Sequence, residues 1–226
     1  METFTESAIT LPAGIRALPI VAGHVALDFA NTVDDPLGPL RFDHIAEYPR
    51  LLVWSKRVGI LSDGAAAELS QLASEHPSRA AAAVRRAHSL RQALNEMFGA
   101  LADGKAPAAG WEHLRSFVVA ATQKARVTSA ASRVSVNWDF VDAESPLWPV
   151  AEASYRLLAS PELKRLKRCV GCPWLFLDRS KNQSRRWCSM EFCGTDEKMR
   201  RYVTRRAERR TAERDVIRPM SAPARD

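Results

Sequence analysis

The sequence lacks any long apolar segment, and no window approaches the length that a membrane-spanning helix needs. The first residues, METFTESAITLPAG, contain two glutamates and lack the basic start and apolar run of a signal peptide. We therefore expect a cytoplasmic protein that does not enter a membrane. In that compartment stable disulfides are uncommon, and clustered cysteines more often bind a metal or carry out redox chemistry.

Cysteine is absent from the chain except for one short stretch. All four cysteines lie within residues 169–193, in the order C-x2-C-x15-C-x4-C, and no histidine follows His113. Two close pairs separated by a loop suit tetrahedral Zn²⁺, because each pair holds one side of the ion. Four thiolates leave no coordination position open, so the pattern predicts one structural zinc per chain, bound by Cys169, Cys172, Cys188 and Cys193. The alternatives are four buried thiols or a redox CxxC pair.

The sequence also lacks a motif that would fix a catalytic geometry. The stretch from His24 to Asp35 contains carboxylates and amides, but no nucleophile paired with a base. We interpret Asp28 as a helix or turn anchor whose carboxylate accepts backbone N–H groups. If this part of the chain binds a small-molecule effector, the candidate ligand-binding residues are Asp28 and Asn31. We expect a protein that is not an enzyme.

Acidic residues are scarce in the C-terminal quarter, where residues 164–218 contain 17 Lys and Arg against 7 Asp and Glu. The whole chain has a formal charge of +7, so the remainder is mildly acidic. This asymmetry predicts a larger N-terminal body and a small basic unit that binds an anionic partner. The alternative is a solvated, charged helix surface without a partner.

The larger body has the residue spacing of amphipathic helices. The best defined segment covers residues 77–104, where apolar side chains recur every three or four positions. Shorter helices are expected at 44–58, at 62–75 with Ser62 as the cap, at 108–123, and from Ser145-Pro146 through Leu158. The alternation in residues 133–140 predicts a half-buried strand, which pairs with residues near 125–130.

The segments between the cysteines predict a treble-clef zinc finger. A knuckle at 169–172 is followed by a strand at 174–178, a polar turn and a second extended piece at 185–188. A helix follows, with Thr195 as its cap and acidic residues in its first turn. The resulting fold class is α+β, with a mainly helical N-terminal domain that contains a small β-hairpin and a C-terminal treble-clef-like finger.

The basic residues of the last predicted helix fall on two neighbouring stripes, which match the phosphates of a nucleic-acid backbone. Met199, Tyr202 and Val203 form a narrow apolar patch that we expect to face the finger or the larger domain. The candidate nucleic-acid-binding residues are Arg185, Arg186, Lys198, Arg201, Arg205 and Arg209. The basic residues nearest to the cysteines are expected to neutralise the thiolates instead; they are Lys167, Arg168 and Arg186.

Two motifs resemble a known family. The run FLDRSKNQSRRWCSMEFCG, residues 176–194, resembles the CGNR zinc finger, which is named after four residues that begin at the last ligand. Here these four read Cys193, Gly194, Thr195 and Asp196, so the ligands are intact while the asparagine and arginine of the family are replaced. The run 23-GHVALDFANTV-33 resembles the GxxALDFVNT element that opens the companion domain, called ABATE.

This resemblance implies a stress-related bacterial transcription regulator. It implies an ABATE-like domain at 1–160 that senses a ligand or mediates homo-oligomerisation, a finger with its basic helix at 161–215 that contacts DNA, and a tail at 216–226. One alternative is a zinc-stabilised module that docks a protein or RNA. In another, the N-terminal domain is an enzyme of unknown chemistry that the finger only stabilises.

Overall fold

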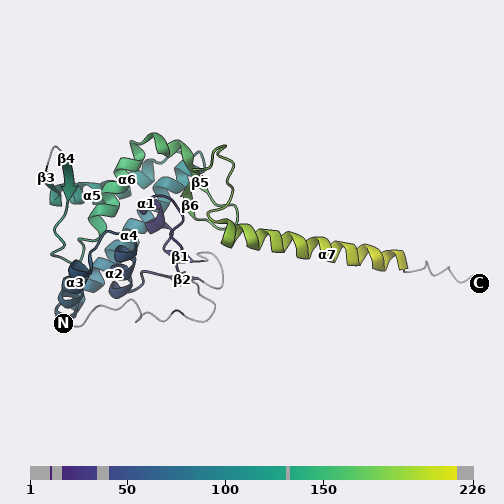
Figure 1. Ribbon diagram of the computed structural model, residues 1–226, viewed down its shortest axis with the longest axis horizontal. Coiled ribbons are helices and arrows are strands. Elements are labelled where there is room, and N and C mark those ends of the chain that lie inside the picture. Colours follow the sequence, from purple (N-terminus) through teal and green to yellow (C-terminus); the bar gives the residue numbers. More distant parts are fainter. Residues whose placement is uncertain (1–10, 12–16, 35–40, 131–132, 218–226) are drawn as a thin grey trace, which may run out of the picture. The chain divides into compact units, whose positions relative to one another are not determined.

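The computed structural model describes residues 11, 17–34, 41–130 and 133–217 (Figure 1). The chain divides into two compact units, Met1–Cys188 and Ser189–Asp226. The fold is α+β, as predicted: the N-terminal region is mainly helical with small two-stranded sheets, and a hairpin and a helix accompany a four-cysteine cluster. None of the helices in these residues is long and apolar enough to span a bilayer.

Helix α4, Pro77–Ala102, is the central element of the first unit (Figure 1). Its buried face includes Leu90, Leu94 and Phe98, which follow the predicted spacing, and the prediction of this helix is confirmed. Around it lie the other helices of the unit: α1 Val25–Ala30, α2 Tyr48–Arg57, α3 Asp63–Glu75, α5 Ala108–Lys124 and α6 Leu147–Leu158. Helix α4 contacts all five of these helices, so the other helices of the unit pack around it.

The helix starts show which sequence signals are reliable. Ser62 caps α3 as predicted, because its hydroxyl oxygen accepts a hydrogen bond from Ala65 N at 3.2 Å. Ser145 does not cap α6; its hydroxyl donates to the carbonyl of Asp142 at 2.6 Å, and the helix begins after Pro146. Helix α2 begins later than expected, since Pro49 lacks an N–H and fits only the first turn.

Each sheet in the described residues is an antiparallel pair. Strands β1 (Val33–Asp34) and β2 (Phe42–Asp43) form the first pair, and β3 (Arg126–Ala130) and β4 (Arg133–Asn137) the second. The predicted pairing of β4 with residues near 125–130 is confirmed. The expected half-buried face is present only in part: Val136, Trp138 and Phe140 are half-buried, whereas Val127 and Val134 are each 71% exposed. The alternating pattern indicates the strand correctly, but no other described element covers these two side chains.

The third sheet follows a short 3-10 helix, η2, Pro161–Arg165. Strand β5, Leu166–Arg168, pairs with β6, Leu175–Leu177. All three side chains of β6 are buried, so this strand is part of the core of the first unit.

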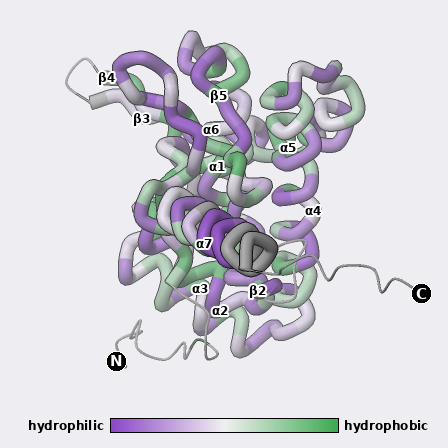
Figure 2. The backbone as a smooth tube through the Cα atoms, turned by 90° about the vertical axis from the view of Figure 1, so that its right-hand side faces the viewer, coloured by the Kyte–Doolittle hydropathy of each residue, from purple (hydrophilic) through white to green (hydrophobic). Residues whose placement is uncertain are grey.

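The second unit is helical in its described part. Met190–Gly194 form one wide turn, and α7 continues over Thr195–Ile217. The predicted cap is wrong: Thr195 is already helical and its hydroxyl donates to Met190 O, whereas Ser189 accepts from Glu191 N and Phe192 N. Figure 2 shows the described part of α7 as predominantly hydrophilic. Met199, Tyr202 and Val203 are 60%, 55% and 58% exposed on α7, and their contact with the finger or the larger domain stays a prediction.

Candidate metal centre and its supports

The first cysteine pair lies at the end of the β5–β6 hairpin. Cys169 N donates to Trp174 O at 2.8 Å, which closes the hairpin around the knuckle. The strand predicted at 174–178 is therefore present, but its partner is β5, and residues 185–188 form no strand. One backbone bond, from Val170 N to Arg186 O at 3.0 Å, connects this second segment to the knuckle.

The four cysteine sulfur atoms form one cluster and lie within 4.8 Å of one another. The sulfurs of Cys172 and Cys188 are 3.7 Å apart, which is too far for a disulfide. Zn–S bonds of about 2.3 Å in a tetrahedron place the sulfurs roughly 3.8 Å apart, so the observed spacing suits one zinc ion. Cys169 and Cys188 are buried, while Cys172 and Cys193 are partly exposed.

A buried carboxylate organises the loop between the two cysteine pairs. Asp178 accepts hydrogen bonds from Ser180 N, Ser180 Oγ and Arg185 N at 3.0, 2.6 and 2.9 Å, and Lys167 Nζ lies 2.7 Å from it. Burial alone would raise its pKa, but these donors hold the pKa of Asp178 well below its usual range. This role of Asp178 was not predicted; the available sequence signal is the Asp-x-Ser spacing, which is typical of a turn closed by a side chain.

The basic residues just before the knuckle have other partners than those expected. The charged group of Lys167 pairs with the carboxylate of Asp178 and that of Arg168 with Asp103, whereas the expected partners were the cysteine thiolates. Arg168 also donates to Pro173 O at 3.0 Å, across the knuckle. Arg186 is exposed and lies over the ring of Trp187 at 5.5 Å.

The helical region holds the cysteine hairpin through main-chain atoms. Asn31, at the end of α1, accepts from Leu175 N at 2.9 Å and donates to Leu175 O at 2.8 Å. The indole N–H of Trp174 donates to Val33 O, and Leu177 N donates to Ala22 O, each at 2.8 Å. The Asn31 side chain thus acts like a neighbouring strand for β6.

The predicted anchoring role of Asp28 is confirmed. Its carboxylate accepts from Val21 N at 3.0 Å and Ala22 N at 2.9 Å, and the residue is 5% exposed. Burial raises the pKa of Asp28 to about 6, against the opposite effect of these two hydrogen bonds. Since Ala22 O accepts from Leu177 N, Asp28 also positions the segment that holds β6. Ligand binding by Asp28 and Asn31 stays a prediction.

Two protein-family models match the chain. Residues 23–161 match the ABATE family, described as "Putative stress-induced transcription regulator". The chain belongs to the ABATE family. Residues 165–206 match the CGNR zinc finger, so the resemblance seen in the sequence is confirmed in both parts. No curated protein matches the chain.

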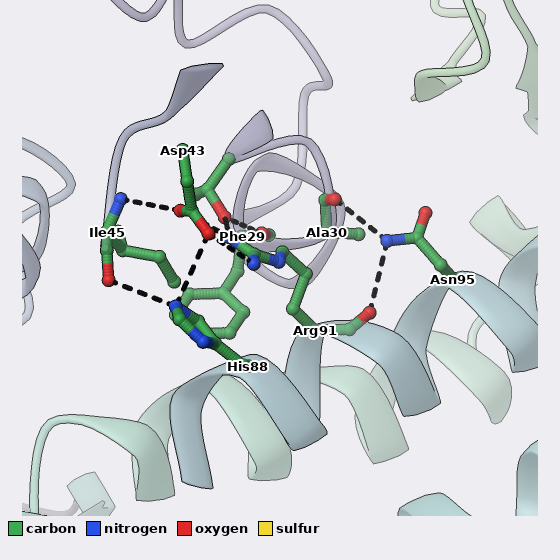
Figure 3. A network of polar contacts seen from close by, with 8 residues as sticks. Phe29, Ala30, Asp43, Ile45, His88, Arg91 and Asn95 are labelled. Carbon is green, nitrogen blue, oxygen red and sulfur yellow. Dashed lines mark hydrogen bonds and ion pairs between the residues drawn. The ribbon is translucent and has the colours of Figure 1, made fainter. Parts of the chain in front are cut away.

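The ABATE region contains a second buried polar cluster, around Arg91 of α4 (Figure 3). The guanidinium donates to both carboxylate oxygens of Asp43 at 2.7 and 2.6 Å and to Thr32 Oγ1 at 3.1 Å. Burial would raise the pKa of Asp43, but Arg91 keeps it below the ordinary value. His88 lies 3.3 Å from the same carboxylate, and Asn95 donates to Ala30 O at 2.9 Å. An arginine within the apolar stripe of α4 was the available sequence signal.

The candidate nucleic-acid-binding residues of the CGNR finger lie in different environments. Lys198, Arg205 and Arg209 are exposed on α7. Arg201 belongs to the same helix, but its side chain is outside the described residues. Arg185 is half-buried, donates to Trp187 O at 2.7 Å and lies 4.7 Å from the centre of the Phe176 ring. Its contact with nucleic acid stays a prediction, as do those of the other candidates.

Proposed function

We propose that this ABATE protein regulates transcription by binding DNA through its CGNR finger and helix α7. The supporting observation is the exposed basic surface of α7, which follows directly after the last cysteine. Among residues 202–210 the charged side chains are four arginines and one glutamate, and all of them are exposed. The described arginines of this basic surface are Arg205, Arg206, Arg209 and Arg210.

The proposed contacts are mainly to phosphates. Arginine binds phosphate oxygens with its planar set of N–H groups, and release of counterions from DNA supplies much of the affinity. Asp196 and Glu197 stand at the start of α7, where they would repel a phosphate. We therefore place the contacts in the middle of the helix. Zinc bound by the four cysteines holds the start of the helix against the knuckle.

The ABATE region is proposed to sense a small-molecule effector or to mediate homo-oligomerisation. Two of its polar clusters, around Asp28 and Arg91, are largely used to hold the fold together. An effector that changes the position of the β5–β6 hairpin would change the cysteine site, because Asn31 connects the two.

Salt-dependent binding to duplex DNA tests the proposal. The zinc-loaded full chain is compared with a variant carrying Arg205→Ala, Arg206→Ala and Arg209→Ala, which keeps helix propensity high. The slope of log K against log salt should become shallower by roughly one unit for each phosphate that the variant no longer binds. A control with Arg79→Ala, Arg85→Ala and Arg115→Ala removes the same charge from exposed positions on α4 and α5 and should bind like the wild type.

Two results would contradict the proposal. One is the absence of salt-sensitive binding to any duplex at low ionic strength by protein with a full complement of zinc. The other is equal weakening by both triple variants, which would reveal a general charge effect. Binding to RNA alone would favour the alternative of an RNA-docking module.

A further inference from the structure

A cavity of about 260 Å³ lies between the ABATE region and the cysteine hairpin, within the first unit. Three arginines from separate parts of the chain line it: Arg41 before β2, Arg91 on α4 and Arg168 on β5. Asn95, Pro173 and Trp174 complete most of the wall. The described lining contains no acidic residue.

Two of these arginines are held in place by carboxylates behind them. Arg91 is fixed by Asp43, and Arg168 by Asp103 at 2.8 and 3.1 Å. A guanidinium has five N–H donors, and the hydrogen bonds described above use three on each of these side chains. Their orientation is therefore set without exhausting their capacity to bind an acceptor in the cavity.

The charges around the cavity do not balance. Three arginines line it, while two of them, Arg91 and Arg168, pair with the carboxylates of Asp43 and Asp103, which leaves one positive charge in excess. The pKa values of both carboxyl groups are lowered: burial opposes this at Asp43 but Arg91 outweighs it, and at Asp103 the hydrogen bond from Arg168 is the main cause. A bound anion would compensate the positive charge that these two carboxylates leave unbalanced.

Helix α4 leaves room for this arrangement at Gly99. A Cβ atom at that position would lie 2.7 Å from Nη2 of Arg168, which is closer than real contacts allow. The missing side chain lets the guanidinium lie directly on the helix, beside Asp103. The position of Arg168 thus depends on a glycine 69 residues earlier in the sequence.

We propose that this cavity binds a small oxyanion, namely the phosphate or carboxylate group of a small molecule. Paired N–H donors of arginine match the oxygens of both groups. The volume is slightly below the usual range for drug-sized ligands, so the ligand is small. The site is separate from Asp28 and Asn31. It adjoins the metal centre, because Arg168 precedes Cys169 and Pro173 follows Cys172.

Titration of the zinc-loaded full chain with inorganic phosphate, and separately with succinate, tests the site without DNA. Calorimetry at constant ionic strength, balanced with chloride, should give saturable binding of at least one anion. Arg41→Gln removes an exposed guanidinium and should weaken that binding by about tenfold. Arg85→Gln removes an exposed charge elsewhere, on α4, and should leave binding unchanged. Binding of phosphate alone assigns a phosphate ligand, and binding of succinate alone assigns a carboxylate.

A second variant changes geometry and keeps every charge. Gly99→Ala must displace the guanidinium of Arg168, and it should also weaken anion binding by about tenfold. Circular dichroism and zinc content verify that the variant is folded. The proposal is overturned if the wild type shows no saturable binding of either anion, or if Arg41→Gln and Gly99→Ala both bind like the wild type. Since no DNA is present, this outcome leaves the proposed DNA binding unaffected.

Discussion

Asn31 is the residue that most directly connects the ABATE region to the cysteine hairpin. Replacement by alanine removes two hydrogen bonds and leaves the buried N–H and C=O of Leu175 without those partners. We expect Asn31→Ala to lower the free energy of unfolding by roughly 2–4 kcal/mol, measured by urea unfolding of the zinc-loaded protein. Asn137→Ala, at an exposed position of β4, should change the free energy of unfolding by no more than about 0.5 kcal/mol. An equal loss of unfolding free energy in the two variants would contradict the role given to Asn31.

Asp28 predicts a pH dependence of stability. The pKa of its carboxyl group is about 6 in the folded protein against an ordinary value of 3.8, so the folded state binds the proton more tightly. The contribution to stability is present at low pH and is lost as the pH rises through 6. Relative to Asp28→Asn, the wild type should lose about 1 kcal/mol between pH 5 and pH 7 in urea unfolding. A constant difference across this range would refute the assignment.

At the scale of single residues, the local roles were predictable and the distant partners were not. Asp28 anchors backbone groups six and seven residues away, which is within reach of a sequence pattern. The partner of Asn31 lies 144 residues further along the chain. An isolated amide in a sequence does not indicate which distant backbone it will bind. Asp178 was missed for a different reason, because its Asp-x-Ser pattern is short and common.

At the scale of secondary-structure elements, the close contact between α4 and α5 depends on Gly110. A Cβ atom there would lie 2.5 Å from both N and Cα of Met97. These are backbone atoms of α4, so they cannot move away as the end of a flexible side chain could. We expect Gly110→Ala to destabilise the protein by roughly 1–3 kcal/mol despite the better helix propensity of alanine. Gly64→Ala in α3, where the nearest atom is 4.0 Å away, should be neutral or stabilising by up to about 1 kcal/mol. Thermal unfolding of the two variants distinguishes these outcomes.

The elements themselves were predictable where the signal is local. Helix α4 follows from its spacing and its Pro and Gly boundaries, and the β3–β4 hairpin follows from alternation. The sequence did not reveal the partner of β6. Residues 185–188 look extended but form no strand, since the N–H of Arg185 donates to the carboxylate of Asp178. A strand of three residues such as β5 has too little sequence to reveal its pairing.

At the scale of the whole molecule, the cysteine cluster predicts one zinc per chain. Metal analysis of reduced, freshly prepared protein should give a stoichiometric value, and Cys188→Ser should lose most of it because the remaining three thiolates bind more weakly. Cys188 belongs to the compact unit that contains the helical region. Loss of zinc should therefore lower the thermal midpoint of that region as well, and a midpoint that does not change would contradict this coupling. Full zinc retention by Cys188→Ser would contradict the ligand set.

The overall organisation was visible in composition, through the basic C-terminal quarter and the confined cysteines. What composition could not reveal is how firmly the first half of the finger is built into the helical region. Three cysteines fall within the unit Met1–Cys188, and β6 is buried there. An independent finger at 161–215 stays a prediction.

Asn31 binds only the main-chain N–H and C=O of Leu175, so these two hydrogen bonds do not depend on which side chain stands at that position. A chimaera in which another finger of the same length replaces residues 165–206 would keep both hydrogen bonds as long as a strand runs there. Substitutions at exposed positions of the finger can therefore accumulate while these two hydrogen bonds persist, whereas the buried side chains of β6 and the indole of Trp174 are constrained by their contacts. Deletion of the finger is a different event, because it exposes an amide and two carbonyl groups that the helical region cannot satisfy by itself.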